Sequence, residues 1–371
     1  MSSELFIGLM SGTSMDAVDC VLADFTESSS IIDFINVEIP PALKKRLLNL
    51  CLAEGSNQIK ELGEADVAVG KLFASAVLAM LEKHQLDNTQ IRAIGSHGQT
   101  IRHQPPGQGT HAFSIQIGDP NTIAAQTGIT TVADFRRKDM ALGGQGAPLL
   151  PAFHQQVFNN TDSNRVIVNL GGMANITLLK KDSPLPLGFD TGPGNVLLDI
   201  WIQKNLGKDL DADGSWAASG NSNAELLGFM LEDPYFRSPA PKSTGREYFN
   251  LGWLETALAD YAKEIAPQDV QATLVELSAC SISQAIQSLI PAGEIILCGC
   301  GSKNARLVQS LNRQLAAFEI STSTAHGVDS DALEALAFAW FARQTLLGKP
   351  IDFTNITGAS RAAIVGGIYL P

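Results

Sequence analysis

The turn at residues 8–16 carries residue types suited to binding a phosphate. Its sequence, GLMSGTSMD, combines small residues with the hydroxyls of Ser11, Thr13 and Ser14 and the carboxylate of Asp16. Main-chain N–H groups in such a turn can approach an anion closely, and hydroxyls add further donors. Taken alone, the same composition also fits an ordinary hairpin turn, in which Gly, Ser and Thr serve only the backbone conformation.

Two further glycine turns lie in the second half of the chain. Residues 188–195, GFDTGPGN, follow an apolar strand pattern and precede a helical one, so the turn faces a helix N-terminus. Asp190 falls at the end of that strand, where a carboxylate can accept a proton from a water or hydroxyl, although an Asx-type turn cap explains it too. Residues 298–304, CGCGSKN, also join a strand to a helix and leave room for a base or ribose.

The familiar nucleotide motifs are missing from the sequence. The Gly-Lys pairs at 70–71, 207–208 and 348–349 are not followed by Ser or Thr, so there is no Walker A loop, and no turn reads GxGxxG. Protein-kinase signatures are also absent. Cys298 and Cys300 lack a second pair at zinc-ligand spacing, so we treat both thiols as packing residues. If the glycine turns bind a nucleotide, the chain must therefore have a nucleotide-binding fold that lacks these motifs.

The elements that position these turns repeat along the chain. Apolar segments at 5–10 and 17–25 flank the first turn and predict a hairpin, and segments at 165–170 and 176–179 flank residues 171–175 in the same way. Two such hairpins half a chain apart indicate duplicated lobes with a ligand between them. A helical pattern at 65–84 and a strand at 91–95 lie between the hairpins, and this alternation predicts an α/β fold.

The length also predicts two lobes, because 371 residues exceed what one hydrophobic core usually holds. We expect a first lobe at residues 1–135 and a second at 136–349, divided near the glycine-rich segment 143–148. A helix at 331–347 ends at Gly348 and Pro350, and the tail 350–371 is expected to return to the first lobe. Residues 102–110, rich in Pro and Gly, predict an irregular loop.

Composition excludes several classes of protein. With 45% hydrophobic and 17% charged residues, the chain is typical of a globular protein. The net charge of −12 repels nucleic acids and anionic lipids, so a phosphate ligand must be held by local amides and a metal ion. The longest apolar stretch, 335–342, is far shorter than the roughly 20 residues that span a bilayer. The odd number of cysteines and the absence of a signal-peptide pattern at the N-terminus predict a cytoplasmic protein.

Ordered blocks over the whole chain carry a family resemblance. They are residues 8–16, 96–100 (SHGQT), 118–120 (GDP), 133–136 (ADFR), 143–148 (GGQGAP), 169–176 (NLGGMANI), 188–195 and 242–250 (KSTGREYFN). From about Phe6 to the C-terminus, the chain resembles the anhydro-N-acetylmuramic acid kinases of the acetate and sugar kinase, heat-shock cognate and actin superfamily. Ala17 and Cys300 stand where a glycine is expected. A left-handed backbone at Ala17 would cost about 1 kcal/mol, so the loop must manage without one.

The resemblance implies an α/β fold of two duplicated ribonuclease-H-like lobes, the actin-like ATPase fold, with a nucleotide and sugar cleft between the lobes. It also implies ATP and Mg²⁺ as cofactors and a homodimer as the assembly. Asp16 and Asp19 would position magnesium through water, and their alternative is a role as solvated turn carboxylates. By resemblance, the ATP-binding residues are Gly12, Thr13, Ser14, Met15, Asp16, Ala17, Val18, Asp19, Gly192, Gly194, Asn195, Gly299, Gly301, Ser302 and Asn304.

The implied reaction opens 1,6-anhydro-N-acetylmuramic acid with water and phosphorylates O6, which yields N-acetylmuramic acid 6-phosphate and ADP for cell-wall recycling. Asp190 would be the general base that activates the water. Two other functions stay open at this point. One is a kinase of the same fold that acts on another sugar or carboxylate, and the other is an ATP-gated binding module like the chaperone and actin relatives.

By resemblance, the sugar would be bound by His97, Asp134, Arg136 and Glu334, with the Arg136 guanidinium on the lactyl carboxylate. Each residue has a structural alternative. His97 would brace its loop, and Asp134 and Arg136 would pair with each other or with neighbouring charges. Glu334 stands three residues after Asp331, which is also the spacing of a helix capping box.

Overall fold

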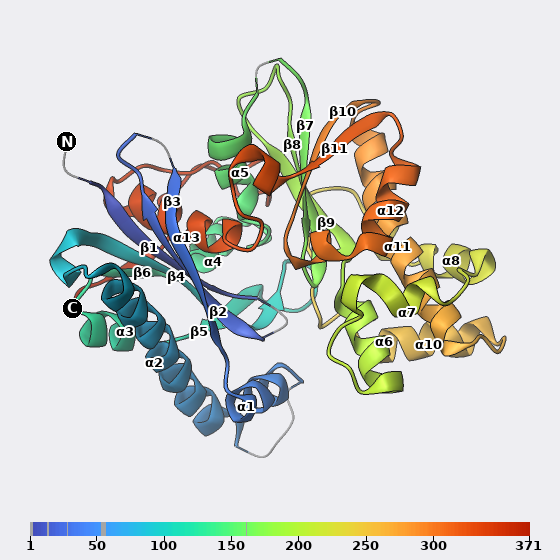
Figure 1. Ribbon diagram of the computed structural model, residues 1–371, viewed down its shortest axis with the longest axis horizontal. Coiled ribbons are helices and arrows are strands. Elements are labelled where there is room, and N and C mark those ends of the chain that lie inside the picture. Colours follow the sequence, from blue (N-terminus) through green and yellow to red (C-terminus); the bar gives the residue numbers. More distant parts are fainter. Residues whose placement is uncertain (1–2, 13–14, 28, 53–56, 161) are drawn as a thin grey trace. The chain divides into compact units, whose positions relative to one another are not determined.

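The computed structural model describes residues 3–12, 15–27, 29–52, 57–160 and 162–371. The chain forms two compact units (Figure 1). Unit 1 is Met1–Phe153 with Asp331–Pro371, and unit 2 is His154–Ser330. These limits differ from the expected lobes, 1–135 with the tail 350–371 and then 136–349. Helix α13, which we had counted with the second lobe, belongs to unit 1.

Unit 1 is built on a sheet of order β12-β6-β4-β1-β2-β3, with β5 paired to β4. Strand β1 is antiparallel to β2 and parallel to β4, so the predicted hairpin lies at the centre of the sheet. The expected strand at 91–95 is longer than predicted, because β4 continues past the SHGQT segment to pair with β5. The strands are β1 Leu5–Ser11, β2 Ala17–Asp24, β3 Ser30–Glu38, β4 Ile91–Gln104, β5 Phe113–Ile117, β6 Thr131–Ala133 and β12 Gly367–Tyr369.

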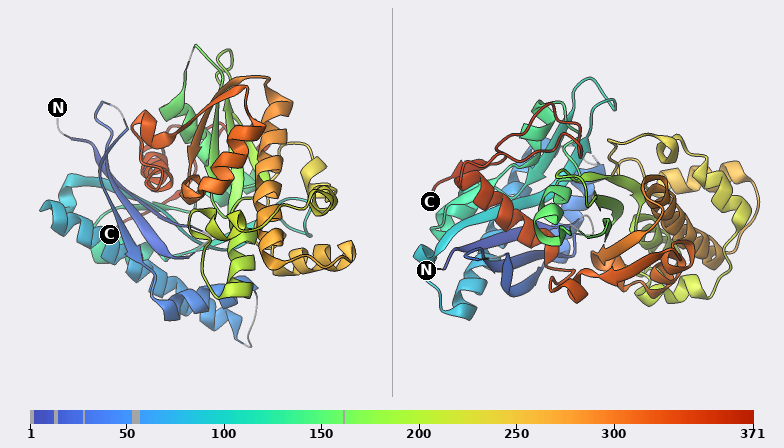
Figure 2. Two further views of the ribbon diagram at one scale, coloured as in Figure 1. Left: turned by 45° about the vertical axis from the view of Figure 1, so that its right-hand side comes forward. Right: turned by 90° about the horizontal axis from the view of Figure 1, so that it is seen from above.

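Helices cover both faces of this sheet, and α13 and α2 lie on opposite faces (Figures 1 and 2). Helix α13 packs so closely on β1 and β4 that a Cβ at Gly8 would lie 1.8 Å from the Ala335 carbonyl oxygen, and one at Gly95 would lie 1.9 Å from that of Phe338. This contact explains why α13 joins unit 1. The helices are α1 Pro41–Leu52, α2 Gln58–His84, η1 Asn88–Gln90, α3 Pro120–Thr127, α4 Arg136–Ala141 and α13 Leu333–Leu346, and α5 Leu150–Phe158 crosses into unit 2.

Unit 2 has a sheet of order β11-β10-β7-β8-β9. Its strands are β7 Arg165–Leu170, β8 Met173–Leu179, β9 Leu187–Pro193, β10 Gly293–Cys298 and β11 Phe318–Thr322. The mostly buried helix α11 packs against β8, β9 and the surrounding helices. The helices are α6 Val196–Leu206, η2 Ala212–Gly214, α7 Ser215–Ala218, α8 Ala224–Leu231, α9 Pro234–Arg237, α10 Leu251–Tyr261, α11 Pro267–Leu289, η3 Cys300–Lys303, α12 Ala305–Gln314 and η4 Ser323–His326.

The two sheets repeat one topology. The order β3-β2-β1-β4-β6 in unit 1 matches β9-β8-β7-β10-β11 in unit 2, with three antiparallel strands followed by two parallel ones in each. This is the ribonuclease-H-like strand order, and it confirms the predicted duplication. Among the described residues, no helix is both long enough and apolar enough to cross a membrane.

Candidate active site

In unit 2, two glycine turns lie directly against each other. The main-chain N–H of Gly194 donates to Gly172 O at 2.8 Å, and that of Asn195 donates to Gly171 O at 2.9 Å. A Cβ at Gly194 would lie 2.4 Å from Gly171 O, so a side chain at residue 194 would push the turns apart. The turn that connects β7 to β8 therefore supports the turn at the start of α6.

The third glycine turn joins the same cluster. A Cβ at Gly301 would lie 2.7 Å from Asn195 Nδ2, and Asn195 Nδ2 donates to Cys300 Sγ at 3.7 Å. Ser302 Oγ donates to Gly299 O at 2.7 Å, and Asn304 caps α12 by accepting from Leu307 N at 3.1 Å. The structure thus brings together all the nucleotide-binding residues that we predicted in unit 2: Gly192, Gly194, Asn195, Gly299, Gly301, Ser302 and Asn304.

Asp190 lies on β9, two residues before Gly192, and only 5% of it is exposed. Its carboxylate Oδ2 accepts from the main-chain N–H of Thr244 at 3.0 Å. Its own N–H donates to Lys242 O at 3.1 Å, and its carbonyl accepts from the hydroxyl of Tyr235 at 2.8 Å. These bonds fix the backbone and the carboxylate of a buried acid beside the glycine cluster.

In unit 1, the loop that we predicted to bind phosphate connects β1 to β2. Thr13 and Ser14 lie outside the described residues, whereas Gly12 O accepts from the side chain of Gln99 at 3.3 Å. Among the described residues of the loop, Met15 has a left-handed backbone, with φ of 56°. Ala17, as expected, does without a left-handed backbone, because it begins β2 and pairs with Glu38.

The carboxylates of this loop have different surroundings. Asp16 is exposed and pairs with Lys44 at 2.5 Å. Asp19, on β2, accepts from Asn36 Nδ2 at 2.7 Å. Burial raises the pKa of Asp19 to about 7, the Asn36 hydrogen bond opposes the rise, and the negative charges of Glu334 and Asp331 add to it.

This concentration of negative charge around Asp19 fits a role beside a divalent cation, because a cation would stabilise the ionised form. Among the described residues, no three His, Cys, Asp or Glu side chains gather into a direct metal-binding group.

His97 and Arg136 form one hydrogen-bonded unit. His97 Nδ1 lies 2.9 Å from Gly98 O, and Arg136 Nε donates to His97 Nε2 at 2.9 Å. Arg136 Nη1 donates to Gly146 O at 2.8 Å. Burial and the adjacent Arg136 charge lower the pKa of His97 well below its usual value, so the ring is neutral and orients the guanidinium.

Asp134 has a left-handed backbone, with φ of 63°, and its carboxylate pairs with Arg137 at 2.6–2.7 Å. This is one of the structural alternatives considered for it. Asp134 and His97 nevertheless line the same cavity of about 220 Å³, together with Ser96, whose buried hydroxyl has no partner among the described residues. An unpaired hydroxyl in a polar cavity is suited to a ligand with hydroxyl groups.

Glu334 does not take part in the capping box that its spacing suggested. The residue before the first turn of α13 is Ala332, and no side-chain capping bond forms there. Glu334 instead lies close enough to Asp19 to affect its pKa, which associates a predicted sugar-binding residue with the phosphate loop within unit 1.

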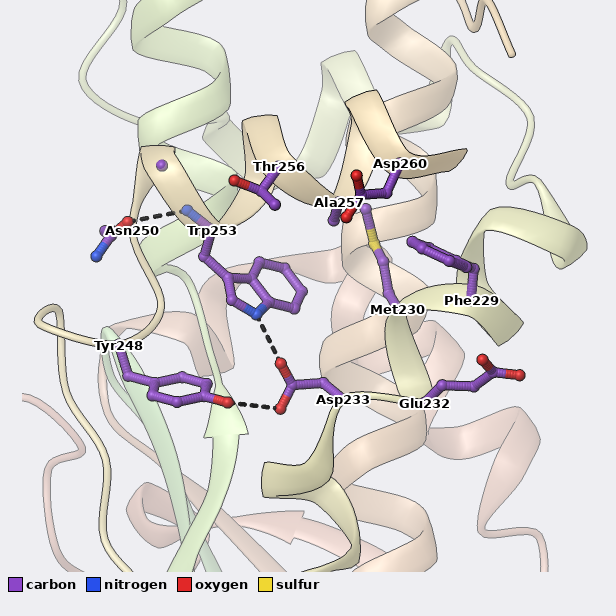
Figure 3. A pocket seen from close by; sticks show the side chains of 11 residues that line it. Phe229, Met230, Glu232, Asp233, Tyr248, Asn250, Trp253, Thr256, Ala257 and Asp260 are labelled. Atoms are coloured by element: carbon purple, nitrogen blue, oxygen red, sulfur yellow. Dashed lines mark hydrogen bonds between the residues drawn. The ribbon is translucent and has the colours of Figure 1, made fainter. Parts of the chain in front are cut away.

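A larger cavity, of about 590 Å³, lies elsewhere in unit 2, by α8 and α10 (Figure 3). None of the predicted site residues lines it. In its wall, Asp233 accepts from Trp253 Nε1 at 2.9 Å and from the Tyr248 hydroxyl at 2.8 Å (Figure 3). These hydrogen bonds hold Asp233, the residue that precedes α9.

Sequence reasoning did not single out several residues that contact or adjoin the predicted ones, among them Ser96, Gln99, Tyr235 and Lys242. Ser96, Gln99 and Lys242 belong to blocks that carried the resemblance, so membership in those blocks was the available signal. Tyr235 lies outside the blocks, and its contact with Asp190 spans 45 residues of sequence. No local pattern could have indicated it.

Comparison with known proteins gives concordant results. A family model described as anhydro-N-acetylmuramic acid kinase matches residues 4–371. Curated proteins of that name from Coxiella burnetii and Shewanella denitrificans are each 51% identical to the chain, over 371 and 367 residues, which is 100% and 99% of this chain and 98% of each relative. A glucokinase of the ROK family from Streptomyces griseus, solved with glucose and AMPPNP, aligns over 92% of this chain and 99% of its own, with 13% identity and a TM-score of 0.41.

Proposed function

The chain belongs to the anhydro-N-acetylmuramic acid kinase family, and from that premise we propose that Asp190 of unit 2 is the base of the reaction. The enzyme converts 1,6-anhydro-N-acetylmuramic acid, ATP and water into N-acetylmuramic acid 6-phosphate and ADP, a step in peptidoglycan recycling. The observation that carries the assignment of Asp190 is its anchoring: a buried carboxylate, held by the Thr244 N–H at 3.0 Å, beside the glycine cluster.

In the proposed reaction, the Asp190 carboxylate accepts a proton from a water molecule as the water oxygen bonds to C1 of the sugar. The C1–O6 bond breaks, and O6 bonds to the γ-phosphorus of ATP as the bond from that phosphorus to ADP breaks. Opening the strained bridge thus supplies the oxygen that is phosphorylated. The remaining contribution of the protein is to position the groups and to stabilise charge.

For ATP, we propose a binding set of residues 12–19 in unit 1 and the glycine cluster in unit 2. The close packing at Gly194 and Gly301 supports this role, because only residues without a side chain let the three turns approach one another so closely. Asp19, with Asp16 nearby in sequence, would hold Mg²⁺ through water. The ion supplies charge neutralisation at the phosphates when it is bound.

For the sugar, we propose His97, Asp134, Arg136 and Glu334 of unit 1. The support for Arg136 is its orientation, since His97 and Gly146 O both hold the guanidinium. A guanidinium held in this way is suited to the lactyl carboxylate of the sugar. The cavity beside His97 and Asp134 supports a role for these two residues.

We also propose a cytoplasmic enzyme that works as a homodimer. None of the five cysteines, all of which the structure describes, forms a disulfide, which is consistent with a reducing compartment. The homodimer rests on the family resemblance alone, and sedimentation equilibrium of the purified protein tests it.

The function is tested by incubating the protein with Mg-ATP and the anhydro-sugar in oxygen-18 water and analysing the product by mass spectrometry. We expect a phosphorylated sugar that carries the label at C1. For Asp190→Asn we expect a loss of at least about 1,000-fold in kcat, because the variant cannot accept the proton. Asp209→Asn, an exposed change in unit 2, is the matched control and should retain activity.

Two results would contradict the proposal. If ATP is consumed while the sugar is recovered unchanged, the substrate assignment fails, and a panel of other sugars and carboxylates identifies the acceptor. If Asp190→Asn retains labelling at the rate of the parent protein, the base lies elsewhere.

A further inference from the structure

Apart from the Thr244 N–H, the segment 242–250 has no role in the mechanism described so far, yet its first residues enclose Asp190. Lys242 O accepts from the Asp190 N–H, and Thr244 N donates to the Asp190 carboxylate. On the other side, the Tyr235 hydroxyl of α9 donates to the Asp190 carbonyl. The base is thus bound by two segments that follow it by about 50 residues in the sequence.

The ammonium of Lys242 is held by neutral groups. Its Nζ donates to Tyr235 O at 2.9 Å and to Phe236 O at 3.4 Å. It lies 4.6 Å from the centre of the Tyr235 ring and 6.0 Å from that of Phe189, the residue before Asp190. Carbonyl oxygens and ring faces bind a cation without neutralising its charge. The charge therefore remains available to act on a nearby anion.

The elements that hold Lys242 are themselves fixed. Asp233 Oδ1 accepts from Tyr235 N at 2.8 Å, which caps α9. The same carboxylate accepts from Tyr248 and Trp253, and Trp253 N is in turn capped by Asn250 (Figure 3). Both ends of the segment 242–250 are therefore tied to the α9 region. A cation held by α9 cannot easily move away from Asp190.

We propose, on the basis of the proposed role of Asp190, that Lys242 is a positioning residue for the catalytic step. Its ammonium, held on the carbonyls of Tyr235 and Phe236, keeps the Asp190 carboxylate ionised and ready to accept a proton. The Tyr235 hydroxyl and the Thr244 N–H set the orientation of the same residue. Charge and orientation are thus supplied by different groups, and each can be removed separately.

Electrostatics within unit 2 are consistent with this coupling. Burial lowers the pKa of Lys242, and the Asp190 charge opposes the fall. Because electrostatic interaction is mutual, the ammonium favours the ionised form of Asp190 to the same extent. Burial raises the pKa of Tyr235, as does the charge of Asp190, so this phenol stays protonated and remains a donor.

Other titratable and polar side chains lie on the segment 242–250 and on the elements packed against Asp190. Arg246, Glu247 and Tyr248 are the further titratable residues of the segment, and Glu247 and Tyr248 both raise the pKa of Tyr235. Strand β8 presents the neutral Asn175 opposite Asp190. On α11, Glu276 forms an ion pair with Arg313. Lys242 is a cation of the segment whose charge interacts with that of Asp190.

The test measures kcat and KM for the sugar across pH in four variants. For Lys242→Met we expect the acid limb of the kcat profile to move up by about one pH unit and kcat near that limb to fall about tenfold, with KM changed less than about twofold. Lys242→Arg, which keeps a cation, should restore the position of the limb. Tyr235→Phe should lower kcat without moving the limb, because it removes a donor and no charge. Lys208→Met, an exposed lysine of unit 2, is the matched control.

A purely structural role for Lys242 predicts different results, since lost stability does not move a pH limb. Circular dichroism and ATP affinity establish that each variant is folded, and Lys242→Gln replaces Lys242→Met if the latter does not fold. An unchanged acid limb in the folded, uncharged variant overturns the proposal. The proposal is also overturned if the acid limb of Lys242→Arg lies at the same pH as that of the uncharged variant.

A second measurement keeps this test separate from that of the proposed function. Carboxyl NMR of protein with ¹³C-labelled Asp, with Asp190→Asn to identify the signal, follows the ionisation of Asp190 without turnover. We expect the titration midpoint to rise by about one pH unit in Lys242→Met. An unchanged midpoint contradicts the proposal even if the kinase reaction is confirmed. A shifted midpoint supports the coupling even if the anhydro-sugar is not the substrate.

Discussion

The two units share a strand order and differ in the chemistry of their turns. In unit 1, the β1–β2 loop is followed by carboxylates, and Asp19 lies near Glu334 and Asp331 in a region of concentrated negative charge. In unit 2, the corresponding β7–β8 turn is Gly171 and Gly172, and its carbonyls serve as contacts for the next glycine turn. One duplicated framework thus supports a charged loop in unit 1 and a cluster of glycine turns in unit 2. The topology decides where turns lie, and the side chains decide what they can bind.

The largest difference expected between the two units is in ATP affinity. It is measured by comparing substitutions at Gly194 of unit 2 and at Ala17 of unit 1, which stands where a glycine is expected. Gly194→Ala should weaken ATP binding by about 100-fold, because the new Cβ would lie 2.4 Å from Gly171 O and separate the turns. Ala17→Gly should change ATP affinity less than about threefold, since Ala17 lies in extended strand backbone. Isothermal titration calorimetry measures both. Equal losses in the two variants would remove the contrast between the units.

The next effect concerns the oriented cation of unit 1. Arg136→Lys should raise KM for the sugar by about tenfold with a smaller change in kcat, because lysine cannot keep the bonds to both His97 and Gly146 O while presenting a planar fork. Steady-state kinetics with the anhydro-sugar test this, and Arg361→Lys, an exposed change in unit 1, is the control. An unchanged KM would exclude Arg136 from sugar binding.

The smallest effect concerns stability. Folding raises the pKa of Asp19 from 3.8 to about 7, so the folded state retains a proton that the unfolded state has released between those pH values. Ionisation of the Asp19 carboxyl therefore lowers the free energy of unfolding as pH rises through this range. A pKa rise from 3.8 to about 7 represents roughly 4 kcal/mol, which solvent screening of this partly exposed carboxyl reduces. Asp19→Asn should therefore raise the free energy of unfolding by about 1 kcal/mol at pH 8, and the gain should vanish below about pH 4.

Urea unfolding at both pH values, with a chelator to remove divalent cations, measures the effect of Asp19→Asn. Asp209→Asn, the exposed change in unit 2, should show no such pH dependence. A gain of equal size at both pH values would mean that the buried charge is not the cause.

Sequence patterns predicted most of the elements and left their limits less certain. The hairpin at β7 and β8 and the helices α6 and α12 lie where the patterns indicated. Strand β4 was predicted too short, because its pairing with β5 depends on a segment beyond the Pro- and Gly-rich loop. The spacing of Asp331 and Glu334 left a capping box open as an alternative, and α13 instead begins after Ala332, which provides no side-chain cap.

The sequence by itself determined the duplicated α/β fold, the glycine turns and the family, because periodicity, turn residues and ordered blocks are local signals. Only the tertiary structure decided which side chains meet: Tyr235 and Lys242 at Asp190, His97 at Arg136, and Asp19 near Glu334, whose contacts span 39 to more than 300 residues. Such contacts arise when separate elements pack into one core. The burial and neighbouring charges that tune each acid and base therefore exist only in the folded chain.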